Sequence, residues 1–140
     1  MLEEEKITYS RRSKASKLEN NLEDVVLLDK IGELSQAYSL GTVAFVGGSL
    51  VNVGGHNPLE PASFSIPVIM GKFHSSVRDI VNSLVNVGAM KIVSNQQDLI
   101  LAFKTFLENP EQAGQKAKQV LDSNRGASEL VFRKVSELVS

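Results

Sequence analysis

The strongest constraint on the fold is a short segment, FVGGSLVNVGGHNPLEP, in which an apolar strand turns into a helix. The run from Val43 to Val46 is too apolar for an exposed strand, and it predicts a strand that is covered on both faces of a parallel sheet. The glycine pair that follows lets the backbone turn without a Cβ clash. Asn57, Pro58 and Glu60 then have the order of an N-cap residue and the first and third helical residues. The segment therefore predicts the carboxyl end of a buried strand.

Short apolar runs alternate with helical patterns along the chain, and this alternation is typical of a parallel sheet with helices on both faces. The predicted strands cover residues 6–10, 25–29, 43–46, 67–70 and 90–93. Crossover helices are expected within 31–40 and 76–88, where Gly88 marks the end of the second helix. The fold class is therefore α/β, a Rossmann-like parallel sheet flanked by helices.

The pattern becomes purely helical after Asn95. One helix is expected to end before the Asn-Pro step at residues 109 and 110, and its apolar stripe includes Leu99, Phe103 and Phe106. Two further helices are expected over 113–121 and 127–139. These helices are predicted to pack back over the sheet.

The composition limits the classes of protein to which the chain can belong. A chain of 140 residues with 42% hydrophobic content suffices for one domain, predicted over 1–140. The net charge of -1, with both signs scattered, argues against a nucleic-acid surface. No cysteine is present, and the two histidines, His56 and His74, lack the spacing of shared metal ligands, so neither a metal nor a cofactor is predicted. The charged N-terminus and the absence of a long apolar run predict a soluble, cytoplasmic chain.

The bend after Val46 is the candidate binding site. Ligands of open α/β sheets bind at the carboxyl ends of the strands, where a helix N-terminus favours anions. Gly54 and Gly55 leave room for a ligand immediately before the predicted helix. This pattern suits a phosphate or carboxylate held by backbone amides. The carboxylate of Glu60 would then accept hydrogen bonds from paired hydroxyls such as those of a ribose.

Structural explanations of the same residues remain open. Asn-x-x-Glu is also a capping box, in which Glu60 returns to the N-cap N–H and no ligand is needed. His56 is compatible with an ordinary loop position. The glycines match neither a P-loop nor G-x-G-x-x-G, and Ser49 does not stand in G-x-S-x-G.

The segment AFVGGSLVNVGGHNPLEPASFSIPVIMG resembles the signature of the Kdo transferases, which transfer 3-deoxy-D-manno-octulosonic acid from CMP-Kdo to lipid A precursor. Upstream, YSRRS resembles the family's Tyr-x-x-Arg-Ser, and LLDKIGELSQAY resembles its Gly-Asp-Thr-Met-Gly-Glu-Leu stretch. Downstream, the resemblance continues through PVIMG and GAMKIV. It covers nearly the whole chain, but only as the C-terminal, donor-binding half of a GT-B glycosyltransferase of lipopolysaccharide biosynthesis.

The resemblance implies a role for each matching residue. Asn57 and Glu60 would hold the ribose and phosphate side of CMP, which favours the ribose role of Glu60 over the cap. Arg12 matches the arginine near the nucleotide, and Gly32 and Glu33 match the segment that approaches the cytosine. Backbone contacts to the phosphate would come from five loop residues: Gly47, Gly48, Ser49, Gly54 and Gly55.

The chain also departs from the family pattern. Leu28, Lys30 and Ile31 stand where the family has glycine, threonine and methionine, so their contacts are in doubt. Lys72 and Arg78 would supply charge where polar family residues are absent, or would simply form a solvated face.

The resemblance implies that an N-terminal domain, apparently missing here, supplies the catalytic base, the acceptor site and the membrane surface. No catalytic residue is therefore predicted within this chain, which is expected to be inactive alone and to meet lipid A precursor only through that domain. In the full-length family the location is the cytoplasmic face of the inner membrane. An exposed sheet edge would invite pairing with a second copy, so a homodimer is a further hypothesis.

Two other functions stay open at this point. One is a GT-B domain for another nucleotide sugar, such as a UDP-linked hexosamine. The other is a non-catalytic interaction module that keeps the fold and has lost the ligand.

Overall fold

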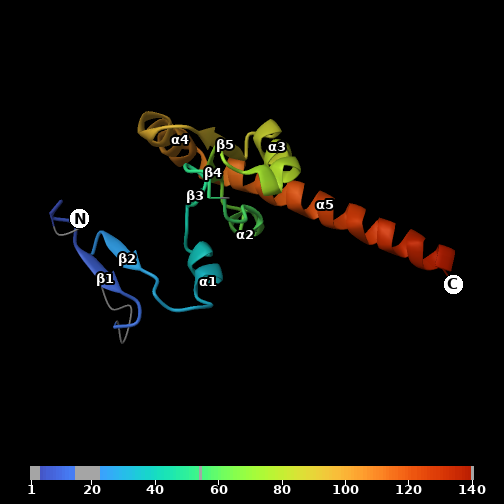
Figure 1. The fold of residues 1–140 in the computed structure, drawn as a ribbon, viewed down its shortest axis with the longest axis horizontal. Helices are drawn as coiled ribbons and strands as arrows, with labels where there is room; N and C mark the ends of the chain where they lie inside the picture. The colour runs from blue at the N-terminus through green and yellow to red at the C-terminus, as the bar shows by residue number, and fades with distance from the viewer. Residues whose placement is uncertain (1–3, 15–22, 54, 140) are drawn as a thin grey trace. The chain divides into compact units, whose positions relative to one another are not determined.

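The computed structural model describes residues 4–14, 23–53 and 55–139, which form helices and parallel strands (Figure 1). They group into two compact units, Met1–Ala37 and Tyr38–Ser140. The predicted α/β class, with parallel strands flanked by helices, is confirmed. The prediction of one domain over 1–140 is not tested by this grouping and stays a prediction.

The first unit contains two parallel strands, β1 (Tyr9–Arg11) and β2 (Val25–Leu27). Their register pairs Tyr9 with Val25 and Arg11 with Leu27. The strand predicted from residue 6 begins later because Lys6 has φ +56°, a left-handed conformation that no strand residue adopts. Helix α1 (Leu34–Tyr38) follows β2. It is not the predicted crossover, since β2 and the next strand belong to different sheets.

The second unit is built on a three-stranded parallel sheet in the order β3-β4-β5. These strands cover Ala44–Val46, Val68–Gly71 and Met90–Val93, within one residue of the predicted bounds. Helix α2 (Leu59–Ser63) joins β3 to β4. A 3-10 turn, η1 (Ser75–Val77), and helix α3 (Arg78–Asn86) join β4 to β5. The predicted stop after α3 is confirmed, because Gly88 has φ +75°.

Side chains of the central strand alternate between two apolar clusters, which is why helices are needed on both faces. Val68 and Met70 lie in one cluster with Val81, Leu84 and residues of α2 and α5. Ile69 lies in the other, where the predicted α4 residues Leu99, Phe103 and Phe106 gather. The expectation that the C-terminal helices pack over the sheet is therefore confirmed.

The two C-terminal helices meet at the predicted Asn-Pro step: α4 spans Gln96–Glu108 and α5 spans Pro110–Val139. Figure 1 shows α5, coloured orange to red, as one unbroken helix. The prediction of separate helices over 113–121 and 127–139 is therefore wrong. A glycine inside a helix costs only about 1 kcal/mol relative to alanine, which is too little for Gly126 to end the helix by itself.

Helix α5 approaches the backbone after α2 very closely. A Cβ built at Gly114 would overlap the Ser65 carbonyl, and Ser65 itself has φ +58°. Glycine at residue 114 therefore permits this helix packing. Within the described ranges, no helix is long and apolar enough to cross a membrane.

Candidate functional site

The glycine turn lies at the carboxyl end of β3, as predicted. Gly48 has φ +70°, a conformation that L side chains rarely adopt, so the turn needs glycine there. Gly47 has a different environment, since a Cβ built on it would have no atom within 4 Å among the described residues. Gly47 therefore borders open space beside the sheet edge.

Ser49 is the link between this turn and the next strand. Its side chain is fully buried, and its hydroxyl donates to the Val46 carbonyl at 2.6 Å while accepting from the Gly71 N–H at 2.8 Å. The Ser49 carbonyl also accepts from the Phe73 N–H at 2.9 Å. These bonds fix the turn after β3 to the end of β4. The predicted contact of Ser49 with a phosphate stays a prediction.

Gly55 closes the same loop through close packing. Its N–H donates to the Phe73 carbonyl at 3.1 Å, and a Cβ there would lie 3.0 Å from that carbonyl oxygen and would overlap the Met70 side chain. His56 donates its N–H to the Gly47 carbonyl at 3.3 Å. Gly54 lies outside the described residues.

Asn57, which was predicted as the N-cap residue, lies just before α2. Its side-chain oxygen accepts from the Leu59 N–H at 3.0 Å. The helix is bounded one residue later than expected, with Pro58 at the N-cap position. The cause is Pro61, which has no N–H to donate to the Asn57 carbonyl. With five residues, α2 is too short for a large helix dipole, so any anion here would depend on loop amides and side chains.

Glu60 lies in the first turn of α2 and is exposed. Among the described residues, no donor makes a hydrogen bond or an ion pair to its carboxylate, so the reciprocal bond of a capping box is not formed. The charge of Glu60 acts on Tyr38, whose pKa is raised first by burial and second by this carboxylate. Tyr38 also packs on Phe64, with ring centroids 6.4 Å apart. The arrangement leaves the Glu60 carboxylate able to accept hydrogen bonds from a ligand.

In the first unit, the structure brings Arg12 and Glu33 together. Arg12 Nε lies 3.1 Å from Glu33 Oε2 as an ion pair, although the geometry at that oxygen is not that of a hydrogen bond among the described residues. Gly32, directly before Glu33, has φ +91°. Three residues predicted separately for the nucleotide therefore form one local group after β1 and β2.

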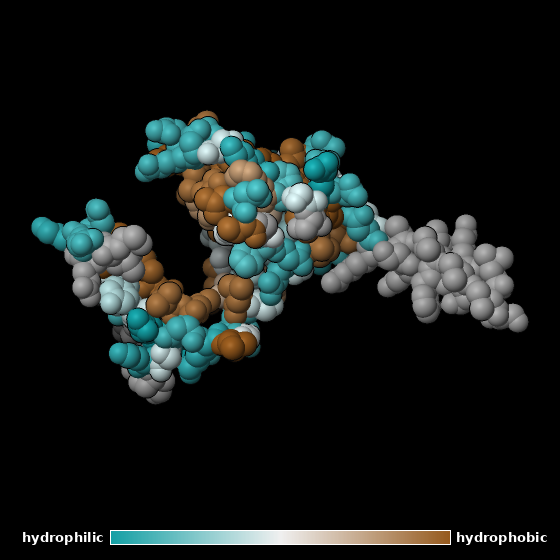
Figure 2. Space-filling model, in the orientation of Figure 1, coloured by the Kyte–Doolittle hydropathy of each residue, from teal (hydrophilic) through white to brown (hydrophobic). Residues whose placement is uncertain are grey.

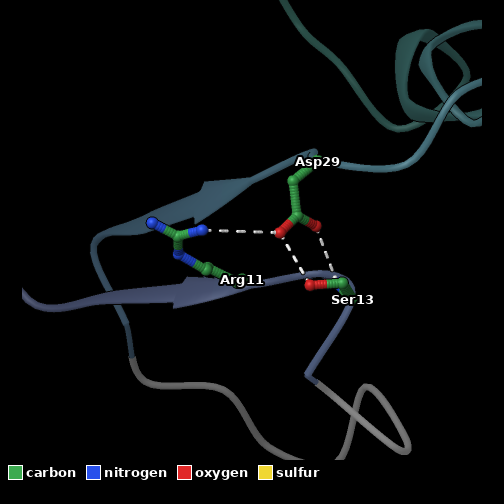
Figure 3. Close-up of polar contacts among 3 residues, drawn as sticks. All are labelled: Arg11, Ser13 and Asp29. Carbon is green, nitrogen blue, oxygen red and sulfur yellow. Dashed lines mark hydrogen bonds and ion pairs between the residues drawn. The ribbon is translucent and has the colours of Figure 1, made fainter.

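Asp29, which was not predicted as a site residue, holds the backbone next to Arg12 in place. The Asp29 carboxylate accepts from the Ser13 N–H at 2.8 Å and from the Ser13 hydroxyl at 2.6 Å, and Arg11 Nη1 lies 4.0 Å from it (Figure 3). These hydrogen bonds, chiefly the one from the hydroxyl, lower the pKa of Asp29, so its carboxyl is ionised at neutral pH. No local pattern in the sequence indicates this pair, because Ser13 lies 16 residues before Asp29.

Lys72 and Arg78 are the two charged residues that depart from the family pattern, and both follow β4 in the chain. The Lys72 ammonium lies 5.2 Å from the centre of the Phe73 ring. Arg78, the first residue of α3, lines a surface depression of about 500 Å³. Neither arrangement distinguishes a binding role from a solvated face. No group of three or more His, Cys, Asp or Glu side chains suited to a metal occurs in the described part of the chain.

Known proteins resemble this chain in sequence and in fold. No protein-family model matches the chain. The 3-deoxy-D-manno-octulosonic acid transferase of Haemophilus influenzae is 42% identical over 131 residues, which cover 91% of this chain and 30% of that enzyme. The enzyme of the same name from Aquifex aeolicus is 44% identical over 94 residues, which cover 67% of this chain and 27% of the relative. The chain is homologous to the Kdo transferases.

A solved structure matches the fold as well as the sequence. The C-terminal CMP-Kdo binding domain of WaaA from Acinetobacter baumannii superposes with a TM-score of 0.73 and 32% identity, covering 86% of this chain and 64% of that domain. The resemblance to the donor-binding half of the Kdo transferases is therefore confirmed. A bifunctional glycosyltransferase/methyltransferase of Fusobacterium nucleatum is 36% identical over 89% of this chain. The chain spans 20% to 30% of the length of these curated relatives.

Proposed function

We propose that this chain forms the donor-binding part of a Kdo transferase, which moves Kdo from CMP-Kdo to lipid A precursor in lipopolysaccharide biosynthesis. The observation that carries the proposal is the exposed Glu60 carboxylate, without a hydrogen bond from the described residues, beside the glycine loop at the carboxyl end of β3. The homology to Kdo transferases and to a CMP-Kdo binding domain supports CMP-Kdo as the donor. It does not favour a UDP-linked sugar or a module without a ligand.

The proposed binding mode assigns one part of the nucleotide to each group. Glu60 accepts hydrogen bonds from the ribose hydroxyls, and Asn57 holds the start of α2 in place. Gly47, Gly48 and Gly54 offer backbone N–H groups to the phosphate, whereas the N–H of Gly55 is already donated to the Phe73 carbonyl. Because a departing CMP gains negative charge, oriented amides would stabilise it without a metal.

Arg12 supplies a positive charge to the nucleotide in the same proposal, and Gly32 and Glu33 approach the cytosine. The ion pair between Arg12 and Glu33 supports this grouping, since one carboxylate orients the guanidinium. The catalytic base, the lipid A precursor site and the location at the cytoplasmic face of the inner membrane are assigned to parts of the full-length family that do not match this chain. The isolated chain is expected to bind donor and not to turn over.

Titration calorimetry with CMP and UDP tests the proposal. We expect the wild-type chain to bind CMP about tenfold more tightly than UDP, because a site that pairs with a base edge rejects an analogue that leaves buried polar groups unpaired. UDP binding tighter than CMP binding would point to another nucleotide sugar. A folded sample with no nucleotide-induced thermal shift would favour the interaction module.

Homodimerisation is a separate proposal, supported by the edge strand β5. Among the described residues β5 pairs only with β4, and a groove of about 510 Å³ beside it is lined by Val85, Ile92 and Leu101 together with Lys91 and Asp98. Figure 2 shows that brown, apolar side chains reach the surface of this unit among teal polar ones. Pairing of this edge with a second copy would cover it. Analytical ultracentrifugation should detect dimer at micromolar concentration; monomer throughout that range would remove the proposal.

A further inference from the structure

Both ends of the β1–β2 pair are closed by the same chemical arrangement. At the amino end, Asp24 Oδ2 accepts from the Thr8 N–H and the Thr8 hydroxyl, each at 2.9 Å. At the carboxyl end, Asp29 accepts from the Ser13 N–H and the Ser13 hydroxyl at 2.8 and 2.6 Å. Each aspartate lies 16 positions after its partner. We call these pairs the amino-end clamp and the carboxyl-end clamp.

The two clamps differ in what lies beside them. The carboxyl-end clamp holds Ser13, which directly follows Arg12, whereas the amino-end clamp lies at the opposite end of both strands. Arg12 donates its own N–H to the Leu27 carbonyl at 2.9 Å. The backbone is therefore fixed both at Arg12 and at the next residue. Of the two clamps, only the carboxyl-end clamp fixes the backbone next to Arg12.

The clamp also separates two adjacent arginines by charge. Asp29 Oδ2 lies 4.0 Å from Arg11 Nη1, and Glu33 Oε2 lies 3.1 Å from Arg12 Nε. Each of the two guanidinium groups therefore has a carboxylate of its own within 4.0 Å. Without Asp29, the Arg11 guanidinium would lose its carboxylate partner, and the Glu33 carboxylate would be shared by Arg11 and Arg12.

We propose that Asp29 is a positioning residue that sets the place of Arg12 for the anionic nucleotide. This inference rests on the donor-binding role proposed for Arg12 above. Asp29 acts through the Ser13 backbone and hydroxyl and through Arg11, and it does not itself touch the donor. Its removal should therefore weaken donor binding only in a chain that has Arg12.

The test compares Asp29→Asn with Asp24→Asn in the full chain, with CMP as the titrant in calorimetry. An asparagine removes the negative charge from either clamp. It also removes one accepted hydrogen bond at Asp29, whose two bonds go to different oxygens, whereas both bonds at Asp24 go to Oδ2 and an amide oxygen can keep them. We expect Asp29→Asn to weaken CMP binding by about tenfold, the order of one charge-assisted contact. Asp24→Asn should change it by less than about twofold, because distant independent sites do not couple. Both should lower the melting temperature, and Asp29→Asn should lower it more because it also loses a hydrogen bond.

A double-mutant cycle separates positioning from direct contact. In an Arg12→Ala background, Asp29→Asn should weaken CMP binding by less than about twofold further, because the group it places is gone. An undiminished effect in that background would overturn the positioning role, as would equal losses from the two clamp variants. If Asp29→Asn does not fold, Ser13→Ala and Thr8→Val remove one hydroxyl from each clamp, and weaker binding is expected only from the first.

Failure of this inference is distinguishable from failure of the proposed function. A folded wild-type chain that binds no CMP overturns both. CMP binding that is unchanged by Arg12→Ala overturns the role of Arg12 and the positioning with it. Weaker binding in Arg12→Ala together with unchanged binding in Asp29→Asn overturns the positioning role alone.

Discussion

Replacement of Gly71 by alanine is expected to lower the free energy of unfolding by about 3 kcal/mol, the upper range for an overpacked core position. A Cβ built at Gly71 would overlap the backbone carbonyl of Ser49 and would lie 2.6 Å from the Leu50 nitrogen. These atoms cannot withdraw easily, since Ser49 is held by its hydrogen bonds to Val46, Gly71 and Phe73. Urea unfolding followed by circular dichroism measures the loss.

The matched control is Gly47→Ala at the other side of the same turn. A Cβ at Gly47 has no described neighbour within 4 Å, and no left-handed φ is imposed there. We expect the free energy of unfolding to change by less than about 0.5 kcal/mol. Equal destabilisation by the two alanines would contradict the idea that close approach of backbone to backbone explains glycine at residue 71.

Local patterns were sufficient to predict the sheet. Val68, Ile69 and Met70 form an apolar run of the length of a strand, and the structure buries all three completely. Helices ended at Gly88 and at the Asn109-Pro110 step, as predicted. Gly88 adopts a left-handed φ, and Pro110 has no backbone N–H to continue a helix. Hydrophobic periodicity also placed Leu99 and Phe106 on the stripe that packs against the sheet.

Features that depend on distant contacts could not be predicted in this way. The Ser49 hydroxyl bonds the Gly71 N–H, 22 residues away, and nothing local to Ser49 indicates that partner. The exclusion of Lys6 from β1 depends on its left-handed φ, for which glycine or asparagine would be the usual signal. Helix α5 continues through residues 122–126, where a break was predicted, since one glycine costs a helix only about 1 kcal/mol.

The ligand contacts of the candidate site residues stay predictions, and the hydrogen bonds among these residues could not be predicted from the sequence. Sequence left the Asn57–Glu60 spacing open between a capping box and a ligand site. The structure contains the bond from Leu59 to Asn57 but no return bond to Glu60 among the described residues. The clamp at Asp29 was missed because its partner, Ser13, lies 16 residues earlier, in the turn after β1.

The electrostatic position of Glu60 can be tested without a ligand. Its negative charge raises the pKa of Tyr38 by disfavouring the phenolate, in addition to the larger effect of burial. In Glu60→Gln that charge is absent, so the Tyr38 pKa should fall toward its ordinary value while the burial effect persists. Ultraviolet titration of the phenolate measures this shift. It verifies that the Glu60 carboxylate lies close to Tyr38 before any binding experiment.

Glu60→Gln is expected to weaken CMP binding by about 10-fold to 100-fold, the range for a hydrogen bond to a charged group. Glutamine keeps the size of the side chain, but it loses the charge that strengthens acceptance from ribose hydroxyls. Stability should change by less than about 0.5 kcal/mol, because the described residues make no capping bond to Glu60. Calorimetry and urea unfolding measure the two quantities.

The control for this prediction is Glu111→Gln, a glutamate in the first turn of α5. It removes the same charge from the same kind of helix position, so any general effect of a first-turn carboxylate is equal in the two variants. CMP binding should be unchanged in Glu111→Gln. If Glu60→Gln leaves CMP affinity unchanged and Glu60→Ala costs about 1 kcal/mol of stability, the residue is a helix cap and the ribose assignment fails.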